Sequence, residues 1–448
     1  MEPASIKEQG DTASPRTLSA EWMLLPGGWH QKMQIEVDID GRIISVGSAS
    51  GEIDEDVVVP GMVNAHSHAF QRDLIGRNQR FQHPDDDFWS WRTGMYDLAG
   101  SLTPATQEDV AFRAFRDMVR HGYTSVCEFH YTHGALQPTN AEIPVLMAEA
   151  VLRAAQRAGI RIRLLPVLYQ QGGFGQRPLG RDQRAFGLNT DVYLRMIEHL
   201  RTESGLSPFQ SIGYAPHSLR AVDLDGLRAV SDHRNDTDKH APIHIHVAEQ
   251  VREVNECMLS LRKRPVEWLL QALPVDASWC LIHATHMSES ERRSVVERGP
   301  TVGLCPTTEA DLGDGFFPLQ EFIQESGRWA IGTDSNLSVN PADELRLLDW
   351  QHRLKTRRRN AFQLDSSRSA GTFLFQQAID GGRCAIGQPV GRIEAGAFAD
   401  LVALNRSLIA EQPLEADETL AAWIHTADPA WIRQVYTGGE PRLTFQMD

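Results

Sequence analysis

Cysteine is scarce in this sequence, and its placement excludes several kinds of site. Five cysteines are spread over 448 residues, and no two of them form a CxxC pair. An odd number of scattered cysteines does not suit a disulfide framework or a cysteine zinc site. We therefore expect free, buried thiols in a reducing compartment, at Cys127, Cys257, Cys280, Cys305 and Cys384.

The sequence also lacks an excess of positive charge and any long apolar run. Its formal net charge is -15 at pH 7, whereas nucleic acids and anionic membranes attract basic surfaces. No stretch reaches the apolar length of a bilayer-spanning helix. Residues 1–17 are polar, without the apolar core of a signal peptide. We expect a disordered leader over 1–17 and a cytoplasmic protein that binds neither nucleic acid nor membrane.

Several common catalytic motifs are missing. The sequence has no HExxH, no G-x-S-x-G, no P-loop and no complete G-x-G-x-x-G. It also lacks the H-x-E…P-C-x-x-C signature, which excludes the deaminase fold of the nucleobase editors. The glycines of GGFGQRP (172–178) precede no helical pattern, so we expect a flexible loop over the active site there.

Both ends of the chain carry short β patterns. The stretch MQIEVDIDGRIISVGS (33–48) alternates apolar and polar residues around Asp40 and Gly41, which predicts a hairpin. Near the other end, GRIEAGAFADLVALN (391–405) reads as a turn followed by a short apolar strand. These patterns predict one small β-sandwich domain built from both termini, residues 18–59 and 385–448.

Between them, residues 60–384 alternate strand-like and helical segments. Thr103 and Pro104 form a good start for one helix, and another pattern ends on Gly159. The strand-like segments are GMVNAHSH, YTSVCEFHY, IRIRLLPVLY, QSIGYAPHS, APIHIHVAEQ, WCLIHATH, TVGLCPTTE and WAIGTDSN. Eight nearly continuous apolar strands predict a (β/α)8 TIM barrel, with a doubly wound sheet as the alternative. The polar residues gathered at the strand ends favour the barrel, whose active site lies at that face.

Histidines and carboxylates stand at these predicted strand ends. His66 and His68 share one face of the first strand because they are two residues apart. The other strand ends offer His217, His244, His246, Glu249, His283, His286 and Asp334. Imidazole and carboxylate ligands that converge on one barrel mouth suit a zinc-type divalent ion.

The fifth strand raises a choice between two histidines. His244 and His246 lie on the same face, but His246 is nearer the strand end, where the metal would be. We therefore predict His246 as the ligand and place His244 inside the barrel or behind the ligands. Glu249 follows in the turn, where it can reach a molecule bound at the metal.

The motifs PGMVNAHSH, HVAE, HATH and GTDS, in this order, resemble the metal-dependent amidohydrolase superfamily. Finer motifs are similar to the formimidoylglutamate deiminases of histidine degradation: HSHAFQR, FWSWR, EFHY, LLPVLY, HSLRAV, HIHVAEQ, WCLIHATH and TEADLGDG. The resemblance covers nearly the whole chain after the leader. It departs at the short C-terminal end, which lacks the usual final strand motif.

This resemblance implies a zinc ion held by His66, His68, His246 and Asp334, with Glu249, His283 and Asp334 as the catalytic groups. The implied reaction is the hydrolysis of N-formimino-L-glutamate to N-formyl-L-glutamate and ammonia. A bound divalent ion can lower the pKa of water from about 15.7 to about 7. A positioned acid–base group contributes about 10² to 10⁴ in rate.

The implied substrate carries two carboxylates, so cations are expected at the mouth. Arg92 and Arg220 are the candidates, because a guanidinium group matches a carboxylate bidentately. Gln71, Tyr131 and His217 match further substrate-binding positions of the family. Arg72 carries no such prediction, and the tryptophans at 89 and 91 are expected to wall the pocket. Dimers are common among relatives, which suggests a homodimer.

Two other functions stay open at this point. One is a related deaminase that acts on an aminated heterocycle of the guanine or adenosine type, which has little need of two arginines. The other is a non-catalytic, metal-binding barrel, which would be expected to lose its acid–base residues. Glu249, His283 and Asp334 are all present.

Overall fold

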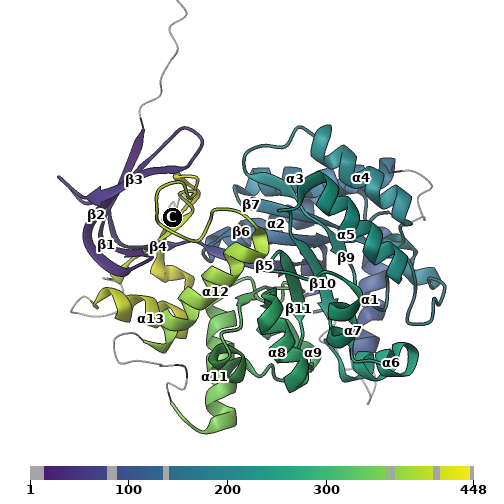
Figure 1. Ribbon diagram of the computed structural model, residues 1–448. Helices are drawn as coiled ribbons and strands as arrows, with labels where there is room; N and C mark the ends of the chain where they lie inside the picture. Colours follow the sequence, from purple (N-terminus) through teal and green to yellow (C-terminus); the bar gives the residue numbers. More distant parts are fainter. Residues whose placement is uncertain are drawn as a thin grey trace, which may run out of the picture.

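The computed structural model describes residues 15–77, 88–134, 141–359, 362, 369–406 and 414–443. Both chain ends contribute to one seven-stranded sheet, drawn in purple and yellow at the left of Figure 1. Its strands are β1 (Arg16–Leu25), β2 (Gly28–Val37), β3 (Ile43–Ser48), β4 (Glu55–Pro60), β14 (Leu401–Leu404), β15 (Ile432–Thr437) and β16 (Glu440–Pro441). The sheet order is β16-β15-β14-β4-β1-β2-β3, so the predicted hairpin around Asp40 and Gly41 is present as β2 and β3. Strand β1 begins at Arg16, so its first two residues overlap the predicted leader.

The rest of the chain forms the predicted barrel. Its strands are β5 (Met62–Ser67), β6 (Tyr123–His130), β7 (Arg161–Leu168), β8 (Gln210–Ile212), β9 (Ala215–Pro216), β10 (Ile243–Val247), β11 (Trp279–His283), β12 (Thr301–Leu304) and β13 (Trp329–Ile331). Each of the eight predicted segments contains strand residues, and the fourth is split into β8 and β9. Parallel bridges from Ser67 to Asp334 and from Ser218 to His246 close the circle. The doubly wound alternative is therefore wrong.

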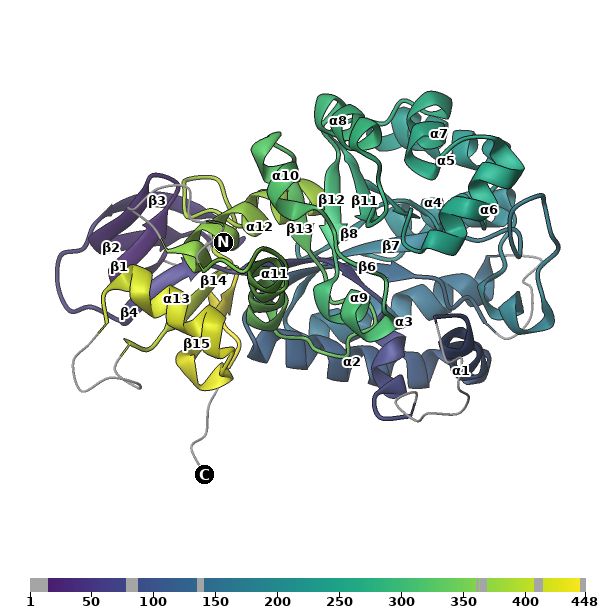
Figure 2. The ribbon, with the colours of Figure 1, turned by 90° about the horizontal axis from the view of Figure 1, so that it is seen from below.

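Helices surround the barrel, as Figures 1 and 2 show from two directions. They are α1 (Phe88–Ser101), α2 (Pro104–Arg120), α3 (Glu142–Ala158), α4 (Thr190–Thr202), α5 (Leu224–Asp238), α6 (Val251–Leu261), α7 (Pro265–Ala272), α8 (Glu289–Arg298), α9 (Pro306–Leu312), α10 (Leu319–Gln324), α11 (Pro341–Thr356), α12 (Ala370–Ile386) and α13 (Ala416–Thr426). Both predicted helix signals are confirmed: Thr103 caps α2, and Gly159 ends α3 with φ 72°. Among the described residues, no helix is both long and apolar enough to cross a bilayer.

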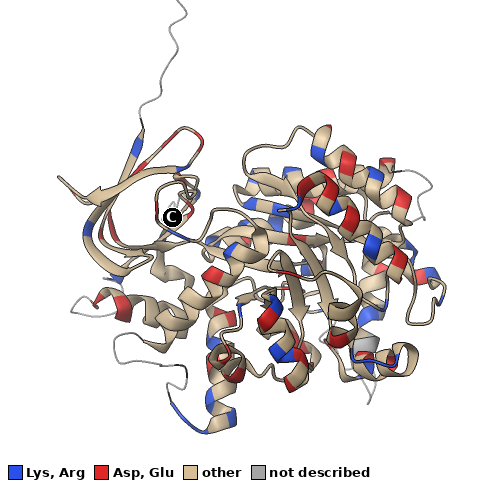
Figure 3. Ribbon diagram, viewed as in Figure 1, with Lys and Arg blue, Asp and Glu red and all other residues tan. Residues whose placement is uncertain are grey.

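Charged residues of both signs are interspersed on the outer helices, whereas the barrel strands are mostly tan in Figure 3. Apart from β8, whose first two residues are half-buried, the barrel strands are buried along their length, with side chains such as Ala65, Ile282 and Ala330 packed together. All five cysteines are free, four of them buried and Cys384 half-buried. Burying an ionisable side chain costs free energy unless it is paired or binds a ligand. The buried histidines and carboxylates at the strand ends therefore indicate a functional site there.

Candidate active site

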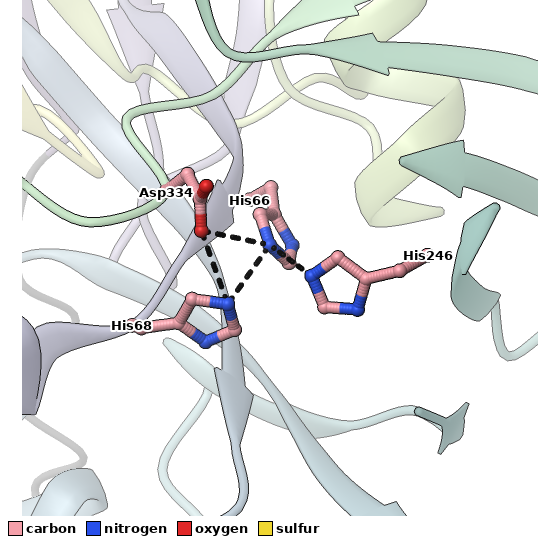
Figure 4. A group of neighbouring side chains, drawn as sticks. All are labelled: His66, His68, His246 and Asp334. Carbon is pink, nitrogen blue, oxygen red and sulfur yellow. Dashed lines mark hydrogen bonds and ion pairs between the residues drawn. The ribbon is translucent and has the colours of Figure 1, made fainter. Parts of the chain in front are cut away.

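Four side chains from three parts of the barrel converge at its mouth (Figure 4). Nε2 of His66 lies 3.1 Å from Nε2 of His68 and 3.1 Å from Nε2 of His246. The Asp334 carboxylate lies 3.1 Å from Nε2 of His68 and 3.4 Å from Nε2 of His66. The structure thus brings together the four predicted ligands, all of them buried.

The hydrogen bonds behind this cluster test whether a metal ion fits it. Nδ1 of His68 donates to the Phe129 carbonyl oxygen at 2.9 Å, and Nδ1 of His246 donates to that of His217 at 3.1 Å. With Nδ1 protonated, a neutral imidazole presents a lone pair at Nε2. Nε2 of His66 can donate its single proton to Nε2 of either His68 or His246 but not to both, so its contact with the other histidine stays repulsive. A divalent cation among these nitrogens removes the conflict, and the donor set suits zinc.

Burial keeps the imidazoles of His66 and His246 in the ligand form. It lowers the pKa of His66 to about 3, and it lowers the pKa of His246 well below its ordinary value. Burial alone would raise the pKa of Asp334, but hydrogen bonds with His66 and His68 hold it well below the ordinary range. Neutral imidazoles and an ionised carboxylate are the forms that bind a metal ion.

The backbone at the strand ends is strained where it presents these side chains. His283 has φ 65° and Asp334 has φ 46°, both in the left-handed region that costs a residue with a Cβ atom free energy. The main chain of Asp334 is held by two hydrogen bonds to one edge of the first strand at its end: its N–H donates to the His66 carbonyl, and its carbonyl accepts from the N–H of His68. Such strain is typical of functional sites, where the surroundings fix an unfavourable conformation.

Two acid–base groups face the cluster. Nε2 of His283 lies 3.6 Å from Oε1 of Glu249 and 3.8 Å from Oδ2 of Asp334. Burial opposes a charge on His283, yet the Glu249 carboxylate raises its pKa to about 10. Burial also opposes a charge on Glu249, and for this carboxyl group the effect is a raised pKa. Glu249, His283 and Asp334 therefore form one buried group that can hold and exchange protons beside the metal ligands.

A pocket opens from this cluster toward solvent. Every predicted substrate-binding residue lines it, together with Glu249 and three of the four ligand residues. Its full lining is His68, Gln71, Trp91, Arg92, Met95, Tyr96, Tyr131, Tyr169, Phe186, His217, Arg220, His246, Glu249, Leu312 and Asp334. A concave, largely apolar site with a few polar groups is the usual form of a small-molecule pocket.

The two arginines of the pocket are held differently. Arg220 is buried, with Nη2 at 3.4 Å from Glu249 and Nε at 3.8 Å from Glu253. Arg92 lies on α1, with its guanidinium 5.4 Å from the centre of the Tyr96 ring and Nη2 at 3.5 Å from the Tyr169 hydroxyl. Both place positive charge at the mouth of a strongly acidic protein.

The polar residues of the pocket wall contact one another. Nε2 of Gln71, from the 3-10 turn Ala69–Leu74, donates to the Tyr131 hydroxyl at 2.7 Å. The Oε1 atom of Gln71 is buried and has no hydrogen-bond partner among the residues that the structure describes. His217 follows β9, and its ring packs 4.6 Å from that of Tyr169. These groups offer polar contacts to a ligand that the protein itself leaves partly unsatisfied.

Other residues singled out by the sequence lie away from the ligand cluster. Nε2 of His244 contacts the carbonyl oxygen of Ala385, on the inner side of the barrel. Nε2 of His286 contacts the carbonyl oxygen of Asp314, and Arg72 donates to those of Asn336 and Leu337. The 172–178 segment forms a turn closed by a bridge between Gly173 and Arg177, and none of it lines the pocket. The side chain at 89 lies outside the described residues.

Sequence reasoning missed several buried carboxyl groups around the site. Glu309, on α9, contacts His283, and Glu253 accepts the N–H of Glu249 at 3.1 Å while facing Arg220. Glu128, on β6, accepts the N–H of Ala69 at 2.6 Å, and burial raises its pKa to about 7. Burial also raises the pKa of Asp314 to about 9. The motifs EFHY and TEADLGDG contain three of these residues, but nothing in the sequence indicated their contacts.

The parallel barrel, its closed circle and the polar cluster at its mouth define a (β/α)8-barrel hydrolase of the metal-dependent type. Comparison with known proteins makes the assignment specific. The chain matches the amidohydrolase family model over residues 57–442. It belongs to the amidohydrolase family, and it is a hydrolase that acts on a C–N bond.

Individual relatives agree with this. The formimidoylglutamate deiminase of Pseudomonas aeruginosa is 38% identical over 424 residues, which cover 94% of this chain and 93% of that protein. The crystal structure of an amidohydrolase from Brucella melitensis has a TM-score of 0.88 at 40% identity and covers 95% of this chain and 94% of its own. An adenosine deaminase from Xanthomonas campestris with bound zinc, at 22% identity and TM-score 0.79, covers 96% of this chain and 94% of its own and shares the fold.

Proposed function

We propose that this enzyme hydrolyses N-formimino-L-glutamate to N-formyl-L-glutamate and ammonia. The observation that carries the proposal is the pocket in which Arg92 and Arg220 lie beside Glu249 and the ligand cluster. The arginines match the carboxylates of the substrate, and Glu249 with His283 matches the proton transfers that an amidine requires. The 38% identical deiminase of Pseudomonas aeruginosa supports the same choice.

We further propose that His66, His68, His246 and Asp334 hold one zinc ion. Their converging lone pairs and the ionised Asp334 support this choice. A divalent ion bound there would lower the pKa of a water molecule toward neutral pH and would supply positive charge beside the carbon under attack. The protein's own groups then have to move the protons and hold the substrate.

The contacts within the cluster support one set of proton transfers. Asp334 takes a proton from the attacking water, because its low pKa keeps it ionised. His283, 3.6 Å from Glu249, orients that water and stabilises negative charge on its oxygen. Glu249 starts protonated, as its raised pKa permits, and donates to the imino nitrogen. Once the new C–O bond has formed, the remaining hydroxyl proton passes to Glu249, and the proton held by Asp334 passes to the same nitrogen. The C–N bond then breaks and ammonia leaves, with Glu249 protonated and Asp334 ionised again.

The remaining pocket residues bind the glutamate part. Arg92 and Arg220 pair with its two carboxylates, and the partners of Arg220 keep its guanidinium in place when the pocket is empty. Gln71, Tyr131 and His217 supply further hydrogen bonds. Binding energy from this end of the molecule orients the formimino carbon at the cluster, which is how a remote contact raises the rate.

Ammonia release tests the function. The zinc-loaded enzyme is expected to release ammonia from N-formimino-L-glutamate with a higher kcat/KM than from guanine or adenosine. Deamination of a purine together with inactivity on the formimino compound would establish the heterocycle deaminase instead. Inactivity on all of them, with zinc bound, would leave a non-catalytic barrel.

The cellular setting follows from this reaction. We propose a role in histidine degradation in the cytoplasm, because the formimino compound is an intermediate of that route in the family. We also propose a homodimer. Sedimentation of the zinc-loaded enzyme tests the dimer, and a mass near that of one 50.1 kDa chain would contradict it.

A further inference from the structure

We infer that Glu309 positions His283 for catalysis, although Glu309 itself is not part of the pocket wall. It accepts a hydrogen bond from the Nδ1–H group of His283, and this contact turns Nε2 toward the reacting atoms. This inference rests on the proposed function for its kinetic consequence. The geometry that carries it involves only contacts within the protein.

The contact joins two buried residues. Oε1 of Glu309 lies 3.2 Å from Nδ1 of His283, and neither side chain is more than 4% exposed. On the far side of the ring, Nε2 has no hydrogen-bond partner within the described part of the chain and faces Glu249 at 3.6 Å and Asp334 at 3.8 Å. The imidazole thus spans from Glu309 to the acid–base group.

The Glu309 carboxylate is itself fixed. The same Oε1 atom accepts the backbone N–H of Cys305 at 2.9 Å, at the start of α9. Because Oε1 of Glu309 makes both contacts, the backbone N–H of Cys305, just after β12, fixes the position of this oxygen. His283 needs such support, since its backbone lies in the strained left-handed region at φ 65°.

This arrangement keeps a proton on Nδ1 of His283. A carboxylate oxygen only accepts, so Nδ1 must be protonated to make the contact, and Nε2 is the nitrogen turned toward the acid–base group. A ring protonated only at Nε2 would instead turn the Nδ1 lone pair toward the Glu309 oxygen. Partners that fix the tautomer and orientation of an imidazole in this way are known to affect activity by about 10- to 100-fold.

A purely structural role for Glu309 is the alternative. Its hydrogen bond to Cys305 also satisfies a backbone N–H at the start of α9, which would stabilise this helix without any effect on His283. Glu344 offers a matched control: it is fully buried and accepts from the N–H and hydroxyl of Thr307 in the same turn, with no contact to His283.

The experiment compares Glu309→Ala, Glu309→Gln and Glu344→Gln in the zinc-loaded enzyme. Glu309→Ala is expected to lower kcat on N-formimino-L-glutamate by about 10- to 100-fold, with KM within about twofold because no substrate contact is lost. Glu309→Gln keeps an acceptor oxygen at the same place and is expected to recover most of kcat. Glu344→Gln is expected to stay within about twofold of the wild type in both constants. Zinc content is expected to be equal in all four proteins.

A second measurement does not depend on activity. Nitrogen-15 spectra of histidine-labelled enzyme report which ring nitrogen of His283 is protonated, with its signals identified by their loss in His283→Asn. We expect the Nδ1 proton in the wild type and in Glu309→Gln, and its loss or exchange in Glu309→Ala. An unchanged His283 tautomer in Glu309→Ala would overturn the inference, as would an unchanged kcat. If the wild type releases no ammonia, the proposed function fails, and the spectra alone then decide the role of Glu309.

Discussion

The contacts of buried arginines differ between the two ends of the barrel. At the base, Arg161 makes two hydrogen bonds to Asp400, at 2.7 and 3.1 Å, and both side chains are fully buried. Two residues on, Arg163 donates to three carbonyl oxygens. At the mouth, Nη2 of Arg220 lies 3.4 Å from Glu249 and its Nε lies 3.8 Å from Glu253.

The same difference holds for the histidines of one strand. His244 is satisfied by a main-chain carbonyl, whereas His246, two residues nearer the mouth, faces the lone-pair side of other imidazoles. Short, complete contacts at the base serve stability. The imidazole contact at the mouth is repulsive unless an ion lies between the nitrogens, which is the kind of local cost in stability that functional sites carry.

The histidine pair offers the largest expected contrast. His246→Ala is expected to lose stoichiometric zinc and with it all measurable ammonia release. His244→Ala should retain zinc, because its ring points to Ala385 rather than to the cluster. Metal analysis by mass spectrometry checks both. Equal zinc in the two variants would remove the distinction between the two positions.

The next largest effect is expected at Glu249. Glu249→Gln is expected to lower kcat by about 10² to 10⁴, since the amide cannot exchange the proton. Zinc content should be unchanged, because Glu249 is not in the ligand cluster. Glu256→Gln, on the outer part of α6, is the control and should match the wild type. Full activity in Glu249→Gln would contradict the proposed proton transfers.

At the base, the expected loss is in stability instead of turnover. Arg161→Ala leaves Asp400 buried without its cation, which is expected to cost about 3–5 kcal/mol of unfolding free energy. Urea denaturation measures it, and kcat of the folded protein should not change. Arg153→Ala removes a half-exposed ion pair with Glu108 and should cost no more than about 1 kcal/mol. Equal losses in the two variants would show that the base is not specially stabilised.

The smallest effect is expected at the arginines of the pocket. Arg92→Ala and Arg220→Ala each remove a charge-assisted contact of about 1.5–3 kcal/mol, so KM for N-formimino-L-glutamate should rise by about 10- to 100-fold. The melting temperature should fall more for Arg220→Ala, which leaves Glu253 without its cation. An unchanged KM in both variants would count against a dicarboxylate substrate.

The sequence predicted the parts of this molecule that depend on local patterns. Apolar runs located all eight strand positions, and the two-residue spacing of His66 and His68 indicated a shared face. The choice of His246 over His244 needed only the direction of one strand. Because all strands of a parallel barrel end at the same face, residues as distant in sequence as His66 and Asp334 could be expected to meet.

Contacts that depend on how helices pack could not be predicted. Glu309 lies on a short helix, and its approach to His283 is set by the turn from β12 into α9. Glu253 reaches Arg220 only because α6 begins immediately after the mouth. The split of the fourth strand and the parallel pairing of β1 with β4 likewise reflect tertiary packing, for which one sequence carries no periodic signal.

We propose that the barrel mouth hydrolyses the terminal C–N bond of an amidine. Mass spectrometry of the products formed from N-formimino-L-glutamate in water enriched in oxygen-18 tests this proposal directly. We expect N-formyl-L-glutamate with one heavy oxygen in the formyl group, and an equal amount of ammonia. Formamide and glutamate as products, or no reaction with zinc bound, would contradict it.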